Sequence, residues 1–94
     1  MAQQKVVQLP AFVVNLLAAI ERRFPGCEVE AEPINGGDNG NYRIAVVSQE
    51  FEGVPLMDRH DLVWRVLEQT IDFDDKYHIM GILTLTPKEL EGEE

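Results

Sequence analysis

Hydrophobic residues recur at helical spacing in two stretches of the chain. In the first, between Pro10 and Phe24, they form one stripe at intervals of three and four residues: Phe12, Val13, Leu16, Leu17 and Ile20. Pro10 suits a first helical turn because its missing N–H would be unpaired there, and Pro25-Gly26 ends the element. A second helix is predicted from Val54-Pro55 to about Ile71, with a buried side made of Leu56, Val63, Val66 and Leu67.

Three further stretches have the composition of strands: Cys27 to Ile34, Tyr42 to Ser48 and Tyr77 to Thr86. Pro33 places the first strand at an edge of its sheet, where a missing N–H donor is tolerated. The stretch Asn35–Asn41, rich in Gly, Asn and Asp, is the strongest turn signal in the chain. The first two strands are therefore predicted to form an antiparallel hairpin.

Both faces of the third predicted strand are apolar. On a two-residue period His78 shares one face with Met80 and Ile82, and the other face holds Ile79, Leu83 and Leu85. The period alone therefore does not decide whether His78 is buried.

The second strand, the second helix and the third strand form a crossover unit. The third strand is therefore predicted to lie parallel to the second, with a right-handed connection. The order α-β-β-α-β predicts an α/β protein of the two-layer α+β kind, with a three-stranded mixed sheet and both helices on one face. Asp72 to Lys76 is expected to be a charged loop, and Lys88 to Leu90 a last helical turn. Residues 1–94 are predicted to form one domain, in which the lead-in 1–9 and the acidic tail 88–94 are flexible.

Acidic residues outnumber basic ones by 17 to 8, which gives a formal net charge of −9. Nucleic acid is bound first through its phosphates by Lys and Arg, so this charge disfavours such a partner unless the bases gather on one face. The same charge suits a solvated surface, or one that attracts a basic partner. No apolar run approaches the roughly 20 residues that span a bilayer, and no cleaved leader is expected. Because Cys27 is the only cysteine, we expect no internal disulfide and a reducing compartment, the cytoplasm.

The residues that could act as a nucleophile or bind a cation lack the pattern that such chemistry needs. Ser48, the only serine, ends a strand and has no neighbouring base and orienting group. The pKa of the Cys27 thiol is expected to be raised by the acids that follow it, Glu28, Glu30 and Glu32. A calcium loop would continue with oxygen ligands beyond Asp72, Asp74 and Asp75, but the next residues are Lys76 and Tyr77. We therefore expect a protein that is not an enzyme.

Two histidines remain as candidates. His60 follows Arg59 inside the second predicted helix, where a histidine is more often a surface or capping group than a ligand. His78 stands at the entry to the third strand. A lone histidine there is usually structural, and metal ligation is the alternative.

Two motifs stand at linked spacing in the second half of the chain. Phe51-Glu52-Gly53 is followed by five residues and then by Arg59-His60, an F-x-G-x5-R-H pattern. The segment His78-Ile79-Met80-Gly81-Ile82-Leu83-Thr84-Leu85-Thr86-Pro87 resembles an ending of the form HALxLxTLTP, with the same distance from His to Pro and no gap. Together with the strand Arg43 to Ser48, these motifs resemble the BolA-like protein family over about half of the chain, from Tyr42 to Leu90.

The resemblance implies a class II KH-like fold, which agrees with the α-β-β-α-β order. It further implies association with a monothiol glutaredoxin, in which the two proteins share a [2Fe–2S] cluster. The histidine matching His78 is then a cluster ligand, while the glutaredoxin and glutathione provide thiolates; imidazole is a known replacement for thiolate on one iron of such clusters. By the same resemblance, Arg59 and His60 are family positions for partner contact or for helix structure.

The sequence departs from the family in two places. Many members carry a second His or Cys in the loop between the first two strands, but Asn35–Asn41 has neither, and Cys27 lies upstream of that loop. The residue after Arg59-His60 is commonly Arg, whereas here it is Asp61. The cluster is therefore expected only in complex with the glutaredoxin and glutathione, held by His78 with either a weaker ligand or a partner-derived one. An interaction of the two apo-proteins, without a cluster, is the alternative.

A second function stays open at this point. A KH-like fold and the regulators described in the family also suggest a nucleic-acid-binding transcriptional regulator, although the net charge and Asp61 argue against it. A plain protein-interaction domain without metal is a third alternative, and a homodimer is a further partner that the sequence leaves open.

Overall fold

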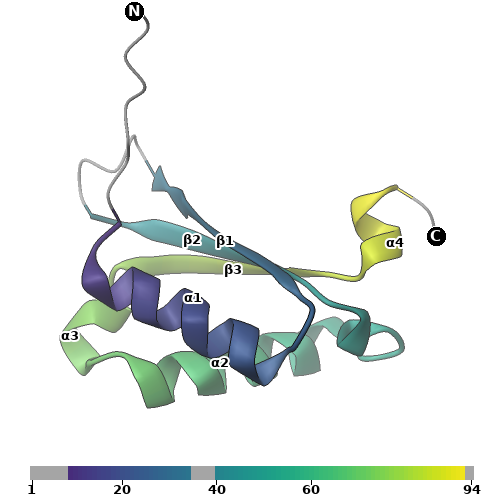
Figure 1. Cartoon of the computed structure of the whole chain (residues 1–94), viewed down its shortest axis with the longest axis horizontal. Coiled ribbons are helices and arrows are strands. Elements are labelled where there is room, and N and C mark those ends of the chain that lie inside the picture. Colours follow the sequence, from purple (N-terminus) through teal and green to yellow (C-terminus); the bar gives the residue numbers. More distant parts are fainter. Residues whose placement is uncertain (1–8, 35–39, 93–94) are drawn as a thin grey trace, which may run out of the picture.

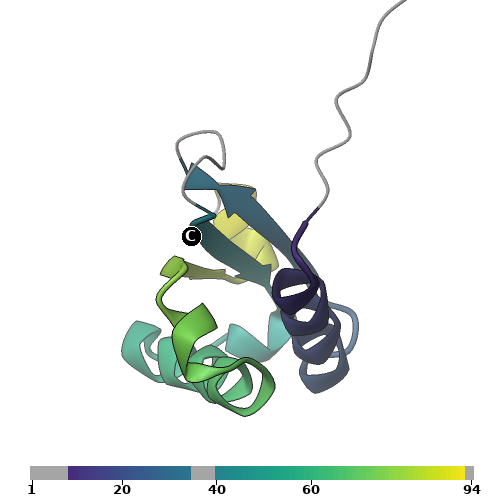
Figure 2. The same ribbon diagram turned by 90° about the vertical axis from the view of Figure 1, so that its left-hand side faces the viewer.

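A sheet with two long helices on one face forms the body of the protein, as Figures 1 and 2 show. The computed structural model describes residues 9–34 and 40–92. The long elements are α1 (Ala11–Arg23), β1 (Glu28–Pro33), β2 (Tyr42–Val47), α2 (Leu56–Thr70) and β3 (Ile79–Leu85). Three short helical elements join or follow them: η2 (Gln49–Phe51), α3 (Phe73–Lys76) and α4 (Pro87–Leu90).

The sheet has the order β1-β2-β3. β1 pairs antiparallel with β2, and β3 pairs parallel with β2 on its other side. The mixed sheet, the helical layer and the α-β-β-α-β order of the long elements confirm the predicted fold class. The turn predicted at Asn35–Asn41 falls mostly on residues 35–39, which lie outside the described residues.

The core lies between the sheet and the helical layer. Its largest fully buried side chains come from α1, β2, η2 and α2 and from the turn after α1: Phe24, Phe51, Leu16, Ile20, Ile44, Leu67, Val13, Val46 and Val63. Phe24 and Phe51 meet edge to face with their ring centroids 5.3 Å apart, which ties the end of α1 to η2. The Phe of the F-x-G motif is therefore a core residue.

The third strand differs from its prediction. It begins at Ile79 rather than Tyr77, and the ladder shifts at its start, where Tyr42 pairs with Ile79 but Arg43 pairs with Gly81. This irregularity leaves Met80 exposed and changes the phase of the strand, because the extra residue interrupts the two-residue period. Ile79, Ile82 and Thr84 consequently face the helices, and the predicted grouping of Ile79 with Leu83 and Leu85 is wrong.

Two smaller expectations also change. The predicted loop Asp72–Lys76 contains the helical turn α3. Leu56 is 66% exposed because it is the first residue of α2, ahead of the buried stripe. The last helical turn is confirmed as α4, where the Thr86 hydroxyl accepts from Glu89 N–H while the Glu89 carboxylate accepts from Thr86 N–H. The flexibility expected of both chain ends stays a prediction, since residues 1–8 and 93–94 lie outside the described residues.

Candidate functional site

His78 lies between α3 and β3, and two backbone hydrogen bonds fix its position. Its N–H donates to the Asp75 carbonyl at 3.0 Å, and its carbonyl accepts from Tyr42 N–H, the first residue of β2, at 2.7 Å. The two bonds fix the backbone of His78 against the end of a central strand. His78 is thus placed immediately before β3, with its side chain half-buried.

The side chain of His78 is oriented by Asn41, the last residue of the predicted turn. Nδ1 of His78 lies 3.0 Å from Oδ1 of Asn41. With the amide oxygen as acceptor, Nδ1 carries the proton, so the neutral imidazole keeps its lone pair on Nε2. Among the described residues, Nε2 has no hydrogen-bond partner. This is the arrangement in which a histidine binds a metal through one nitrogen while the other donates to a carbonyl group.

Neighbouring groups complete the setting of the imidazole. The ring of Phe12, in the first turn of α1, lies 6.0 Å from it between centroids. Gly40 adopts φ +70°, and a Cβ there would stand 3.8 Å from His78 Nδ1. Tyr77 and Met80, on either side in sequence, are 68% and 58% exposed. His78 therefore lies at a surface with apolar side chains beside it.

Sequence analysis missed Asn41. The predicted strand order contained the signal. Asn41 directly precedes β2, and in a parallel pair it faces the residue that directly precedes β3. Here that residue is His78. Where many family members are expected to carry a His or Cys in this loop, the loop of this chain ends in an amide that contacts the histidine.

Cys27 cannot assist His78. Cys27 precedes β1 beside the carboxyl end of β2, whereas His78 lies at the amino end of β2, so the six-residue strand separates them by about 20 Å. Across residues 9–34 and 40–92, no group of three or more His, Cys, Asp and Glu could hold a metal ion. Within the described part of the chain, His78 is thus a single candidate ligand and not part of a complete metal site.

The predicted pKa shift of Cys27 has a different main cause. Its pKa is raised, as expected, but chiefly by burial, with smaller contributions from Glu21 and Glu50. Glu28, which follows it, is not among the causes. The hydroxyl of Ser48 accepts from Glu50 N–H and caps η2, so the structure gives this serine a structural role.

Arg59 lies inside the molecule. It is 9% exposed; its Nε donates to the Val54 carbonyl at 2.8 Å, and its two terminal nitrogens reach the Glu89 carboxylate at 2.8 and 3.3 Å. Its guanidinium also lies 5.9 Å from the Phe51 ring centroid. Phe51 and Arg59 of the F-x-G-x5-R-H pattern are thereby in contact. Through its ion pair with Glu89, Arg59 also links α4 to the start of α2. A partner contact by Arg59 stays a prediction.

His60 points to solvent on α2, away from these contacts. Its ring stacks on Trp64, one helical turn later, with centroids 6.3 Å apart and an interplanar angle of 11°. Its assignment to partner contact is not tested by the structure. The structure does not bring His60 and Arg59 together with His78, so the predicted site residues do not form one cluster.

The sequence profile of the family described as BolA-like protein matches residues 27–89, about two thirds of the chain. The chain belongs to the BolA-like family. No curated protein matches this sequence significantly. The BolA-like match includes both sequence motifs, from Phe51 to Pro87, and the strand pair before them.

Solved structures of BolA-like domains share the fold. The BolA domain of SufE1 from Arabidopsis thaliana is 24% identical and covers 87% of this chain and 99% of its own, with a TM-score of 0.67. BolA1 from the same plant is 21% identical and covers 85% and 96%, with a TM-score of 0.65. A Bol-like protein from Babesia bovis is 19% identical, with 96% of each chain covered and a TM-score of 0.51. No helix of the described part is long and apolar enough to cross a membrane.

Proposed function

We propose that this protein is a non-enzymatic adaptor that binds a monothiol glutaredoxin and shares a [2Fe–2S] cluster with it through His78. The adaptor would act in iron–sulfur trafficking or in iron and redox regulation. One observation carries the proposal: the contact between His78 Nδ1 and Asn41, which leaves Nε2 as the unprotonated nitrogen. Family membership adds to it.

The role of the chain in this proposal is to present one ligand at a protein surface. Phe12, Asn41 and the backbone bonds to Tyr42 and Asp75 fix the imidazole before any partner arrives. A preoriented ligand lowers the entropic cost of binding. The cluster, as cargo, would bring electron transfer or transfer of iron and sulfide, and its remaining ligands would come from the glutaredoxin and glutathione.

The test is to mix the protein with a glutaredoxin that carries its cluster and to record visible circular dichroism. We expect a new spectrum with the wild-type chain and none with His78→Ala. Arg65→Ala is the control, because Arg65 is an exposed residue of α2 to which no site role is assigned. An unchanged wild-type spectrum, or an equal effect of both variants, would contradict cluster sharing.

Binding of the apo-proteins is measured separately by calorimetry. If the cluster-loaded proteins show no spectral change but the apo-proteins still bind, the chain is an interaction domain without metal. Iron analysis of the co-purified pair distinguishes the same two cases. The single cysteine is the reason to place this function in a reducing compartment, the cytoplasm.

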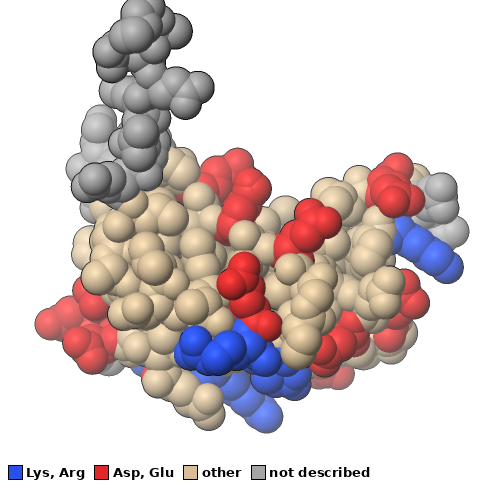
Figure 3. Space-filling model, in the orientation of Figure 1, with Lys and Arg blue, Asp and Glu red and all other residues tan. Residues whose placement is uncertain are grey.

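Ion pairs and the net charge of −9 argue against the nucleic-acid alternative, although most of the bases lie on the helical side (Figure 3). Within residues 9–34 and 40–92, four of the seven basic side chains are paired with carboxylates: Arg23, Arg43, Arg59 and Lys76. Figure 3 shows most of the basic side chains low in the view, on the helical side, and a further one at the right beside α4, while acidic side chains lie over the sheet, around α4 and at the lower left. Phosphate contacts need unpaired cations, so we expect no gel shift at physiological salt.

A further inference from the structure

The face of the sheet opposite the helices carries acids on β1 and mostly apolar residues on β2 and β3. Two rows of paired residues cross it near α4: Glu28 with Val47 and Leu85, and Glu30 with Ala45 and Leu83. A third row, farther from α4, holds Glu32, Arg43 and Gly81, and there Arg43 is paired with Glu32. Leu83 is 44% exposed, although it lies on an interior position of β3. Such a face has no covering layer in the described structure except at one end, where α4 rises beside it (Figure 1).

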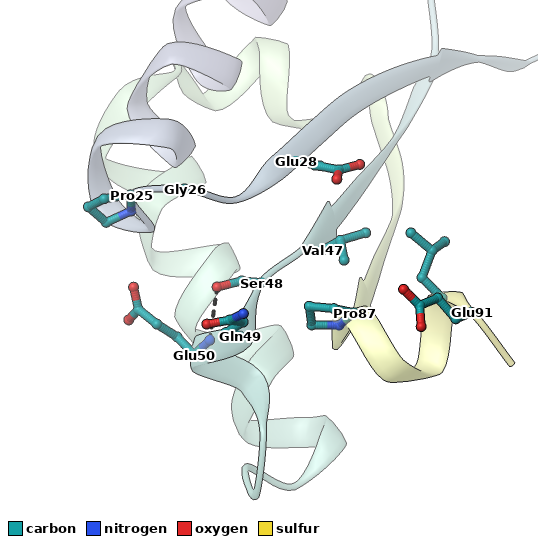
Figure 4. Close-up of a pocket in the computed structure, with 10 residues that line it drawn as sticks. Pro25, Gly26, Glu28, Val47, Ser48, Gln49, Glu50, Pro87 and Glu91 are labelled. Carbon is teal, nitrogen blue, oxygen red and sulfur yellow. Dashed lines mark hydrogen bonds between the residues drawn. The ribbon is translucent and has the colours of Figure 1, made fainter. Parts of the chain in front are cut away.

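α4 turns this end of the face into a groove. Two hollows of about 440 and 250 Å³ meet there and share Glu28, Val47 and Leu90. α4 forms the wall of the groove and the sheet face forms its floor. Leu90, on α4, is 53% exposed, so the wall as well as the floor carries an apolar side chain. Figure 4 shows Glu28 from β1 and Glu91 beyond α4 on two sides of the space, with Val47 between them. We call the region formed by Glu28, Glu30, Val47, Leu83, Leu85 and Leu90 the α4 groove.

The charge of the groove has one sign. Four acids line the two hollows, Glu28, Glu30, Glu50 and Glu91, and neither hollow is lined by a Lys or Arg. The nearby Arg23 is 3.4 Å from Glu50 and offsets only that carboxylate. An apolar floor with acidic rims is complementary to an apolar stripe flanked by cations.

The wall of the groove, α4, is held in place by a contact with α2. Glu89 of α4 accepts from Arg59, which is itself held by the Val54 carbonyl. The capping box at Thr86 sets the direction in which α4 leaves β3. A groove whose wall is already ordered loses less conformational entropy when it is filled.

We propose that the α4 groove is the docking surface for a basic amphipathic helix of a partner protein. A helix is the element that packs on a sheet face, as α1 and α2 do on the other side, and Lys or Arg beside its apolar stripe would reach the glutamates. A second copy of this chain is disfavoured because it carries the same acids and a net charge of −9.

This surface is distinct from the surroundings of His78. α4 follows the carboxyl end of β3, whereas His78 precedes its amino end, so the two lie at opposite ends of the sheet (Figure 1). The proposal does not depend on a cluster at His78. Two partners, one at each end, could then be bound at the same time.

The probe is a synthetic Leu/Lys amphipathic peptide of about four helical turns, added to the ¹⁵N-labelled full chain. We expect amide shifts confined to β1, β2 and residues 83–91, and none with a matched Leu/Glu peptide. Leu83→Glu and Leu90→Glu should each weaken binding about tenfold or more, since each removes a central apolar contact. Met80→Glu is the matched control, an exposed apolar position of the same strand at the His78 end, and should change nothing.

Three results would overturn the proposal. Shifts spread over the surface, with equal affinity for the Leu83→Glu and Met80→Glu variants, would mean that the acidic protein attracts cations without a site. The absence of any shift with excess peptide would mean that the groove takes no such helix. Sedimentation showing a dimer that Leu83→Glu dissociates would assign the groove to a second copy. A well-dispersed amide spectrum of each variant shows that it is folded, so that a loss of binding is not mistaken for misfolding.

Discussion

His78 Nδ1 lies 3.0 Å from Asn41 Oδ1, and this contact sets which nitrogen of the imidazole is available to a ligand. The two residues are 37 positions apart, one at the end of the β1–β2 loop and the other before β3. They meet because β2 and β3 run parallel and begin side by side. A contact of this kind orients a histidine without contributing a second ligand.

Replacing Asn41 should therefore alter the tautomer of His78. Asn41→Ala removes the acceptor, so we expect the ¹⁵N shifts of the imidazole to change from one dominant tautomer to a mixture. Loss of a group that orients a ligand lowers metal affinity by about 10–100-fold, and the glutaredoxin-dependent spectrum should weaken accordingly. Asn41→Asp keeps an acceptor and should retain the wild-type tautomer. Identical imidazole shifts in wild type and Asn41→Ala would contradict the assigned role.

Replacing Arg59 should lower the free energy of unfolding and leave the surroundings of His78 unchanged. Arg59→Ala leaves the partly buried Val54 carbonyl without its charged donor, and such bonds contribute about 2 kcal/mol to the free energy of unfolding. Arg59→Lys should recover only part of this, because an ammonium cannot copy the forked geometry. Urea denaturation measures both. Arg65→Ala, an exposed residue of the same helix, is the control and should change stability little.

The pair between Arg59 and Glu89 makes part of the stability depend on pH. Hydrogen bonds from Arg59 and from the Thr86 backbone lower the pKa of Glu89 below its usual 4.5. Because the folded pKa is the lower one, this contribution is complete above about pH 4.5 and is lost as the pH falls through the folded value. Glu89→Gln should flatten the acid limb of a plot of unfolding midpoint against pH. An unchanged acid limb would show that the pair does not contribute.

Cys27 should react slowly with alkylating reagents. Burial, with Glu21 and Glu50 nearby, raises the pKa of its thiol, so less thiolate is present at neutral pH. We expect iodoacetamide to modify the native chain more slowly than the urea-unfolded chain, followed by mass spectrometry. Glu21→Gln should increase the native rate slightly. A native rate at or above the unfolded rate would contradict the raised pKa.

The order of elements could be predicted from sequence because it depends on local pattern. The stripe of α1, the Pro-Gly stop after it and the alternation of Tyr42, Ile44 and Val46 each lie within a few turns or one strand. The helix between β2 and β3 then predicted their parallel pairing, which the structure shows. The motif spacing was enough to indicate the family, which the profile match confirms.

Contacts between distant residues were decided only by tertiary structure. The irregularity at Met80 reversed the faces of β3, since one extra residue shifts the phase of every position that follows. Arg59 became internal because Glu89, 30 residues later, and the Val54 carbonyl both meet it. His78, by contrast, was indicated by sequence as the candidate ligand. That Asn41 orients it, and that Cys27 lies at the other end of β2, followed from strand pairing, which no local pattern encodes.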